Sequence, residues 1–236
     1  MENLMVSNTN VVGIIGAMEL EVEMLKQQMN QVKKETVASF DYYVGKIADR
    51  EVIVTCSGIG KVNAAACTQI LIDRFGVNYL INTGIAGGLH TEVKVCDLII
   101  SKDVTYHDVC KKQMVKHFPF QEYFEGDQRL IEAALQACEQ LETDGLNYHL
   151  GRIVTGEAFV SDNDLKQRII ADYDPHCVEM EGGAIGHVAY INQVPFVVIR
   201  CISDHADHEA NLSYDVFEKI AAKHSARIVL KMLAMI

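Results

Sequence analysis

Long hydrophobic runs, prolines and tryptophan are scarce in this sequence. It contains no tryptophan and only 3 prolines in 236 residues, and its apolar stretches are short. A membrane-spanning helix needs about 20 consecutive apolar residues, so no segment qualifies. The first residues, MENLMVSNTN, also lack the basic and apolar regions of an export signal. Because repeats and low-complexity tracts are absent too, we expect one globular domain of a cytoplasmic protein with no membrane partner.

Positive charge is also in short supply. The chain has 21 Lys and Arg against 32 Asp and Glu, which gives a net charge of −11. A general nucleic-acid surface requires clustered basic residues that neutralise phosphates, and here they are scattered, so no nucleic-acid partner is expected. The 7 cysteines make an odd number and include no Cys-x-x-Cys pair. Most lie in apolar runs, which favours buried thiols over disulfides or a metal site.

Strand-like and helix-like segments alternate along the chain. Short apolar runs predict strands at 11–16, 42–48, 51–58, 79–84, 97–106, 152–155 and 196–203. Helical spacing predicts helices at 17–29, 61–76, about 127–141, and from Asp162, Met180 and Ser213. Several strands are apolar on both faces, which indicates an α/β fold with a central mixed twisted sheet flanked by helices on both sides. We expect one domain over 11–236, after a poorly ordered extension at 1–10.

Glu21 is the first polar residue in an unexpected place. Ligands of open α/β sheets gather outside the carboxyl ends of the strands, and Glu21 follows the first predicted strand. On the helix, it lies about 40° from Leu25, at the edge of the apolar stripe. It can serve as a carboxylate that offsets the helix dipole, or as a partly desolvated general base with a raised pKa.

Glu181 is the second such acid. Ala184, Ile185 and Val188 follow it at helical spacing, which predicts that Glu181 shares an apolar helix face. The glycines in the segment EGGAIG each weaken a helix by about 1 kcal/mol relative to alanine, which indicates that something packs closely there. A buried acid beside closely packed backbone is typical of a functional site.

The last predicted strand carries an arginine and ends on an acid. Arg200 interrupts an apolar run, and a buried guanidinium needs an anionic or polar partner. Glu179 or Glu181 can supply a structural ion pair. Ser203 and Asp204 end the strand where a ligand would lie, although such residues also favour capping the next segment.

Two glycine-rich turns and one aromatic residue complete the pattern. The turns, CSGIGKVNAA and INTGIAGGL, follow strands and permit close backbone approach, but neither matches GxGxxG or a phosphate loop. Phe159 is a large aromatic in a short loop directly after a strand, in GRIVTGEAFVSDND. A flat ligand lying against it would explain that position. Together, these features suggest an uncharged polar ligand and acid/base chemistry.

Seven segments resemble, in the same order, those of the 5′-methylthioadenosine/S-adenosylhomocysteine nucleosidases. They are GIIGAMELEVEML, SGIGKVNAAA, NTGIAGGL, YHD, VTGEAFV, VEMEGGAIGHVAY and VPFVVIRCISDHAD. That family belongs to the superfamily of purine nucleoside and uridine phosphorylases, and the resemblance extends from about Val11 to the C-terminal helix. The combination of VEME, ISDxAD and GAMxxE is the specific part, whereas the glycine turns support only the superfamily.

The resemblance implies a reaction and roles for particular residues. The enzyme would hydrolyse the N-glycosidic bond of 5′-methylthioadenosine, S-adenosylhomocysteine and 5′-deoxyadenosine and release adenine, with neither a metal nor a cofactor. Asp204 would protonate adenine N7, oriented by Ser203. Glu21 would activate the attacking water, with help from Arg200, and Glu181 would hold the ribose hydroxyls. The family also implies a cytoplasmic homodimer that serves methionine salvage and amino-acid biosynthesis.

The resemblance also implies how the substrate is held. Phe159 would stack on adenine, and the backbone of Val160 would pair with its Watson–Crick edge. Met180 would pack against the ribose. The remaining substrate-binding residues implied are Met18, Ile59, Ile85, Glu179 and Tyr214, of which Met18, Ile59 and Tyr214 line the ribose and alkylthio end.

The sequence departs from the family in two places. Ile85 stands where the family has a serine, so a hydroxyl that could hold the water is missing. The segment after YHD, VCKKQMVKHFPFQEYFEGD, replaces a segment rich in Tyr and Gly that reaches the neighbouring subunit's pocket. Phe118, Phe120 and Tyr123 are the candidates for that contact.

Three alternatives remain open from the sequence. The first is a phosphate-dependent purine nucleoside phosphorylase, which is disfavoured because a carboxylate, Glu21, stands where phosphate would bind. The second is a nucleosidase for another nucleoside, such as a futalosine-type substrate. The third is a nucleoside-binding protein without turnover, which the presence of all three acids argues against.

Overall fold

The computed structural model describes residues 10–141, 146–207 and 210–236, so nearly all of the predicted N-terminal extension (1–10) lies outside the described residues. The strands are β1 (Val12–Gly16), β2 (Asn30–Val37), β3 (Phe40–Ile47), β4 (Arg50–Cys56), β5 (Tyr79–Gly88), β6 (Leu98–Tyr106), β7 (Phe124–Glu125), β8 (Tyr148–Thr155), β9 (Cys177–Glu179) and β10 (Phe196–Asp204). The helices are α1 (Glu19–Gln28), α2 (Lys61–Phe75), α3 (Lys111–Lys116), α4 (Gln128–Leu141), α5 (Asn163–Tyr173), α6 (Gly182–Asn192) and α7 (Ala210–Met232).

The strands form one mixed sheet that partly closes on itself. β5 lies at the junction, because it pairs in parallel with both β1 and β10. From β10 the pairing continues through β6, β8 and β9 and returns to β5, which closes a ring of strands. β1, β4, β3 and β2 extend the sheet beyond the ring. The α/β fold with a mixed sheet is confirmed, whereas ring closure was not anticipated.

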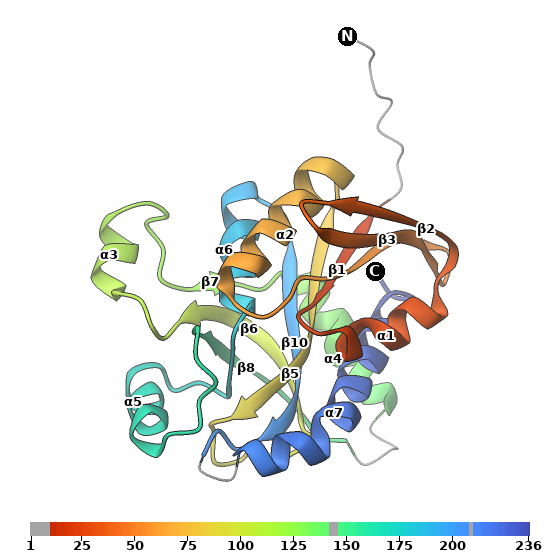
Figure 1. Cartoon of the computed structure of the whole chain (residues 1–236). Coiled ribbons are helices and arrows are strands. Elements are labelled where there is room, and N and C mark those ends of the chain that lie inside the picture. Colours follow the sequence, from red (N-terminus) through yellow and green to blue (C-terminus); the bar gives the residue numbers. More distant parts are fainter. Residues whose placement is uncertain (1–9, 142–145, 208–209) are drawn as a thin grey trace.

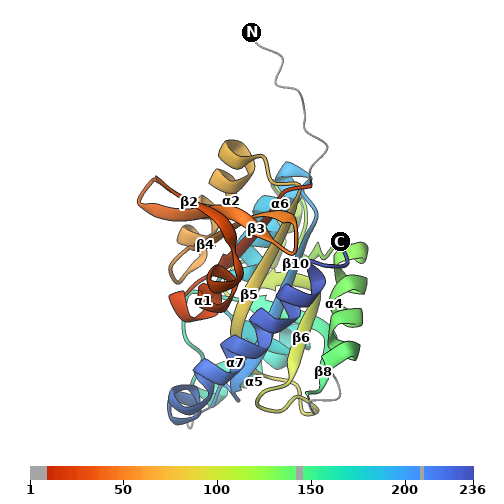
Figure 2. The same cartoon turned by 90° about the vertical axis from the view of Figure 1, so that its right-hand side faces the viewer.

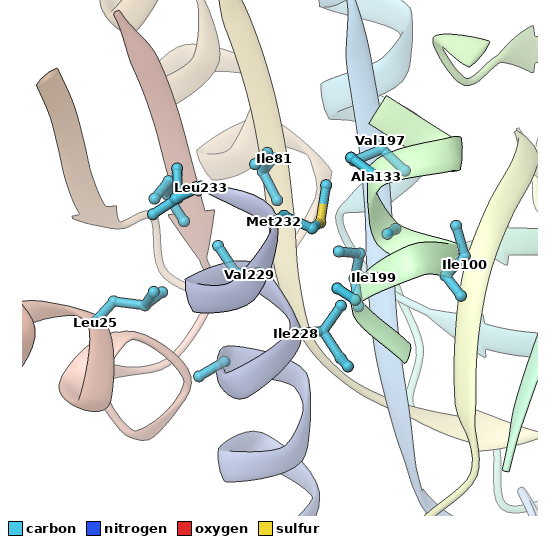
Figure 3. Close-up of a cluster of buried hydrophobic side chains, with 14 of the residues drawn as sticks. Leu25, Ile81, Ile100, Ala133, Val197, Ile199, Ile228, Val229, Met232 and Leu233 are labelled. Carbon is cyan, nitrogen blue, oxygen red and sulfur yellow. The ribbon is translucent and has the colours of Figure 1, made fainter. Parts of the chain in front are cut away.

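Helices cover the sheet on two sides, as predicted. One apolar cluster joins α1, α4 and α7 to the sheet, and a second joins α2 and α6 to its other side. Figures 1 and 2 show α1, α4 and α7 together on one side, with α2 and α6 away from them. The first cluster includes Leu25 of α1, Ile228 of α7 and Ile199 of β10, which are labelled in Figure 3. None of the described helices is long and apolar enough to span a membrane.

Helix ends follow the local sequence signals. Gly76 closes α2 in the left-handed conformation, with φ of 63°, and donates its backbone N–H to the Ile72 carbonyl. Asp162 caps α5, because its carboxylate accepts the Leu165 N–H at 2.8 Å. Both ends match the predicted helices at 61–76 and from Asp162. Glycine permits the left-handed region without strain, and aspartate is a favoured N-cap.

Several predicted boundaries were wrong. The segment INTGIAGGL is not a turn, because β5 continues through it to Gly88. The last two helices begin at Gly182 and Ala210 rather than at Met180 and Ser213. Glu181 therefore precedes α6 as its N-cap residue and does not share an apolar helix face.

Candidate active site

One cavity of about 470 Å³ brings together nearly all the predicted site residues. Its lining includes Met18, Glu21, Ile59, Ile85, Phe159, Glu179, Met180, Glu181, Arg200, Ser203, Asp204 and Tyr214. Val160 is the exception and lines a small adjoining cavity of about 30 Å³, which shares Phe159, Met180 and Asp204 with the large one. The side chains at 21, 181 and 204 thus surround a shared space, although they are far apart in the sequence.

The ends of β1, β5, β9 and β10 position these residues. Ala17 and Met18 follow β1, Ile85 lies near the end of β5, and Asp204 ends β10. Gly84 of β5 is essential for this convergence, because a Cβ at that position would clash with Arg200 Nη1 and Glu21 Oε1. The predicted close approach to a glycine therefore occurs, within a strand rather than a turn.

Glu21 is a buried carboxylate that lines the cavity. Its Oε2 accepts the backbone N–H groups of Ala17 at 2.7 Å and Met18 at 2.9 Å, and its Oε1 accepts that of Ile85 at 3.0 Å. Burial raises the pKa of Glu21, and nearby Arg200 together with these hydrogen bonds opposes the rise. The carboxylate thus satisfies donors at the start of α1 and is also desolvated, while its role as a general base stays a prediction.

Arg200 lies among three glutamates. Its guanidinium forms a close ion pair with Glu179, and it lies 3.4 Å from Glu181 Oε2 and 3.8 Å from Glu21 Oε1. Nη2 also donates to Asn82 Oδ1 at 2.7 Å. We call Glu21, Glu179, Glu181 and Arg200 the charged floor; each is 6% exposed or less.

Glu181 is held by the loop before α2. Its Oε1 accepts the Gly60 N–H at 2.9 Å. Burial raises its pKa to about 7, against the lowering effect of Arg200. Gly60 adopts φ of 100°, a conformation that favours glycine. Among the described residues, Oε2 of Glu181 accepts only a long bond of 3.4 Å from Arg200, so this cavity-lining carboxylate keeps acceptor capacity that suits hydroxyl donors.

Asp204 has its own partners, separate from the floor. Ser203 Oγ donates to Oδ2 at 2.7 Å, and the Ala206 N–H donates to Oδ1 at 2.8 Å. The residue is 1% exposed, and burial raises the pKa of its carboxyl. Ser203 therefore fixes one oxygen of the Asp204 carboxyl group, and the bond to Ala206 stabilises the following turn as well.

Apolar side chains surround the opening of the cavity. Phe159 packs edge-on against Tyr214, with ring centroids 5.7 Å apart, and the Tyr214 hydroxyl lies 3.3 Å from the Met18 sulfur. Ile59 and Phe159 are 52% and 43% exposed. We call Met18, Ile59, Phe159 and Tyr214 the apolar mouth.

Val160 lies beside the mouth and offers its backbone hydrogen-bonding groups to a ligand. Within the described part of the chain, no hydrogen bond uses its N–H or carbonyl. A loop with a free donor and acceptor next to an exposed aromatic ring can bind the edge of a flat heterocycle.

The sequence interpretation missed a polar network that fixes the Gly60 loop. Asp108 binds Lys61 Nζ at 2.7 Å and accepts the Glu157 N–H at 2.9 Å. Glu157 in turn accepts the Lys61 N–H at 2.9 Å. Asp108 belongs to the YHD segment and Glu157 to VTGEAFV, so both lie in segments that carry the family resemblance, although the resemblance implied no role for either side chain.

The segment 118–123 stays away from this chain's own cavity. Phe118 and Phe120 are exposed on the surface, and Tyr123 packs under Arg152, 4.2 Å from ring centroid to guanidinium carbon. None of the three is among the described residues that line the cavity. Nor do the described residues contain a group of three or more His, Cys, Asp or Glu side chains arranged to hold a metal ion.

Comparison with known proteins places the chain in a class. The family model described as "Phosphorylase superfamily" matches residues 11–234. The chain therefore belongs to the phosphorylase superfamily, in agreement with its fold and with a cavity at the ends of its strands.

Individual relatives narrow the assignment. A 5′-methylthioadenosine/S-adenosylhomocysteine nucleosidase of Geobacillus thermodenitrificans is 40% identical over 230 residues, which covers 94% of this chain and 96% of the relative. The crystal structure of such a nucleosidase from Neisseria meningitidis, in complex with methylthio-immucillin-A, has a TM-score of 0.91 and 36% identity, and the match covers 96% of this chain and all of that one. The chain is a member of the 5′-methylthioadenosine/S-adenosylhomocysteine nucleosidase family.

A futalosine hydrolase has a similar fold. The enzyme of Helicobacter pylori has a TM-score of 0.88 at 29% identity, and the match covers 97% of this chain and 99% of that one. The shared fold thus accommodates more than one nucleoside.

Proposed function

We propose that this protein hydrolyses the N-glycosidic bond of 5′-methylthioadenosine and S-adenosylhomocysteine, and also of 5′-deoxyadenosine, and releases adenine. The observation that carries the proposal is the single cavity that holds Asp204 beside the loop of Phe159, and Glu21 beside Arg200. An acid near a site for the base and a second carboxylate near a buried arginine are the groups that this reaction requires.

In the proposed reaction, the bond between ribose C1′ and adenine N9 breaks and its electrons move into the purine. Asp204 gives its proton to N7 of the base, and burial favours the protonated form of Asp204 beforehand. The oxygen of a water molecule bonds to C1′, and Glu21 accepts a proton from that water. Solvent then returns a proton to Asp204 and removes one from Glu21.

The charged floor stabilises the transition state of this reaction. Positive charge develops on the sugar as the base leaves, and the carboxylates of Glu21 and Glu181, which line the cavity, would stabilise that charge. Glu181 accepts hydrogen bonds from the ribose hydroxyls through the positions that Gly60 leaves free. Arg200 holds the carboxylates in place and offsets part of their charge.

The apolar mouth accounts for the rest of the substrate. Phe159 stacks on adenine and the Val160 backbone pairs with its edge, while Met180 packs against the ribose. Met18, Ile59 and Tyr214 provide apolar surface for the alkylthio group, and the exposure of Ile59 leaves room for a longer tail.

Phosphorolysis is the main rival, and the floor argues against it. A phosphate would have to approach Glu21 and Glu181, and like charges repel strongly in a buried site. Ile85, which lines the cavity next to Glu21, offers phosphate no hydroxyl.

Incubation with 5′-methylthioadenosine, S-adenosylhomocysteine and adenosine, with and without phosphate, tests the proposal. We expect free adenine from the two thioethers at a rate independent of phosphate. A strict phosphate requirement would contradict hydrolysis. Including futalosine tests the alternative raised by its hydrolase's similar fold; faster cleavage of futalosine would reassign the substrate.

We also infer that the protein acts as a homodimer. The pair between Lys61 and Asp108 brings the start of α2 beside the segment that leads into α3. Large apolar side chains are exposed on these segments: Ile59, Val62, Val115, Phe118 and Phe120. A second copy covering them would bring the 118–123 segment toward its neighbour's mouth. Sedimentation is expected to give twice the chain mass of 26.3 kDa, and a monomer would contradict the inference.

The proposed setting is methionine salvage in the cytoplasm. All seven cysteines are free, and Cys67, Cys138, Cys177 and Cys201 are buried. Free thiols in this number suit a reducing compartment. The thioribose released by the proposed reaction is the portion that salvage would reuse.

A further inference from the structure

Thr155 is a buried residue that the proposed reaction does not use. It ends β8, is fully buried and is not among the residues that line the cavity. Its hydroxyl nevertheless makes two hydrogen bonds next to the site. Oγ1 donates to Glu179 Oε1, and it accepts the Gly183 N–H at 2.6 Å. Thr155 thus connects the end of β8 to the first turn of α6.

Glu179 carries this connection into the charged floor. Its Oε2 accepts the backbone N–H groups of Glu181 at 3.0 Å and Gly182 at 2.6 Å, and it also accepts Arg200 Nη2. A carboxylate has about four acceptor positions, and the bonds from Thr155, Arg200 and the two amides use that number. The side chain is only 2% exposed. Glu179 therefore has little capacity left for ribose hydroxyls, unlike Glu181.

The two groups that Glu179 holds belong to the charged floor, which serves the sugar in the proposed reaction. The amide bonds fix the turn from which the Glu181 side chain projects. The ion pair fixes Arg200, whose Nη1 lies 3.8 Å from Glu21 and 3.4 Å from the Ile85 carbonyl. If Glu179 moved, Arg200 would be free to pair more closely with Glu181 and to withdraw that carboxylate from the substrate.

We propose that Thr155 and Glu179 are positioning residues for the hydrolysis: the Thr155 hydroxyl orients Glu179, and Glu179 holds Arg200 and the Glu181 turn for binding of the sugar. This inference rests on the proposed function. It assigns Glu179 a role through other residues in place of direct contact with the substrate. Phe159, Val160 and Asp204, which serve the base, make no hydrogen bond with either residue in the described part of the chain.

Two substitutions at Thr155 separate the hydroxyl from packing. Thr155→Val keeps the shape and removes the hydroxyl, whereas Thr155→Ser keeps the hydroxyl and removes a methyl group. We expect Thr155→Val to lower kcat/KM for 5′-methylthioadenosine by about 10- to 100-fold, and Thr155→Ser to stay within about threefold of the wild type. Equal losses in both variants would assign the effect to packing and overturn the proposal.

Binding measurements give a readout that does not depend on turnover. Calorimetry with adenine probes the base end, and calorimetry with 5′-methylthiotubercidin probes the base and sugar ends together. For Thr155→Val, the affinity for adenine should stay within about twofold, while that for 5′-methylthiotubercidin should fall about tenfold. Parallel losses for both ligands, or no loss for either, would contradict a role in positioning the sugar site.

Glu179→Gln provides a second route if Thr155→Val does not fold. The amide keeps the size of the side chain but loses the charge that holds Arg200, so the same pattern of lost sugar affinity and retained adenine affinity is expected. Wild-type affinity for 5′-methylthiotubercidin in Glu179→Gln would overturn the proposal. Failure of the proposed function would be distinguishable from failure of this inference, because the wild-type protein itself would then bind the nucleoside without releasing adenine.

Discussion

The charged floor and the apolar mouth of one cavity are built in contrasting ways. Every carboxylate of the floor has at least one backbone N–H partner, and Arg200 lies 1% exposed among them. In the mouth, Ile59 is 52% exposed and Phe159 has one edge-on aromatic neighbour. The floor is therefore fixed before a substrate arrives, while the mouth has open apolar surface still to be covered.

This contrast indicates where catalysis and selectivity reside. A network of buried charges tolerates little change, because only the interactions with its partners compensate each charge for its lost hydration. Apolar surface is less demanding, since its contribution scales with the area covered. Substitutions of Asp204 and Glu21 should lower kcat strongly, whereas those in the mouth should mainly weaken binding.

The largest effect is expected at Asp204. Asp204→Asn retains an oxygen that can accept from Ala206 but removes the acidic proton, so kcat should fall by about 10³-fold. Adenine release monitored spectroscopically measures this, and an unchanged melting temperature would show that the fold persists. Turnover close to that of the wild type would remove Asp204 from the role of acid.

Glu21→Gln should cause the next largest loss of kcat. The amide cannot accept a proton from water, so we expect kcat to fall by about 10²- to 10³-fold, while the affinity for adenine at the other end changes little. Single-turnover kinetics and calorimetry check the two parts separately. A variant that turns over normally would show that water is activated by another group.

A single methyl group added against the charged floor should be nearly as damaging. In Gly84→Ala, the added Cβ would clash with Arg200 Nη1 and Glu21 Oε1, so both groups must move. We expect about a 100-fold loss of kcat and a destabilisation of about 1–3 kcal/mol, measured by urea unfolding. Gly76→Ala is the control, because a Cβ there meets no atom within 4 Å and the cost is limited to its positive φ. Equal activity losses in the two variants would refute the steric explanation.

In the mouth, Phe159→Ala should raise KM by about tenfold with a smaller change in kcat, because a stacking surface of about 1–3 kcal/mol is lost. Tyr214→Phe is the matched control, since it keeps the aromatic neighbour of Phe159 and removes only the hydroxyl. A loss confined to kcat in Phe159→Ala would show that the ring acts on the chemical step instead.

The smallest effect concerns pH and stability. Burial raises the pKa of Glu181 from 4.5 to about 7, so the folded protein binds this proton more tightly than the unfolded chain. Its contribution is therefore present below pH 4.5 and is lost as pH rises toward 7. Relative to Glu181→Gln, the wild type should lose roughly 1–3 kcal/mol of unfolding free energy across that range. Parallel pH profiles of the two proteins would contradict the raised pKa.

The sequence predicted the site better than it predicted the sheet. Glu21 and Asp204 were recognisable as charges beside the end of an apolar strand, and Arg200 as a charge that interrupts one. The structure brings all three to one cavity. β2 was missed because its sequence, NQVKKETV, is polar and nearly all exposed, as can occur in an edge strand, and β2 is at the edge of the sheet beside β3 among the described strands.

Other features depend on contacts distant in sequence. The pairing of Gly87 with Val178 that closes the ring of strands has no local signal. Thr155 resembles any threonine at the end of a strand, and its role emerges only when Glu179 lies beside it. Glu181 was placed on a helix face because the apolar spacing after it is helical, while its own backbone, with φ of −135°, lies outside the helix.

Hydrolysis in ¹⁸O-labelled water tests the central claim most directly. With 5′-methylthioadenosine as substrate and no phosphate present, we predict one ¹⁸O atom per methylthioribose in the first turnover and an equal amount of free adenine, measured by mass spectrometry. Adenine that appears only when phosphate is added, together with an unlabelled sugar phosphate, would contradict the account.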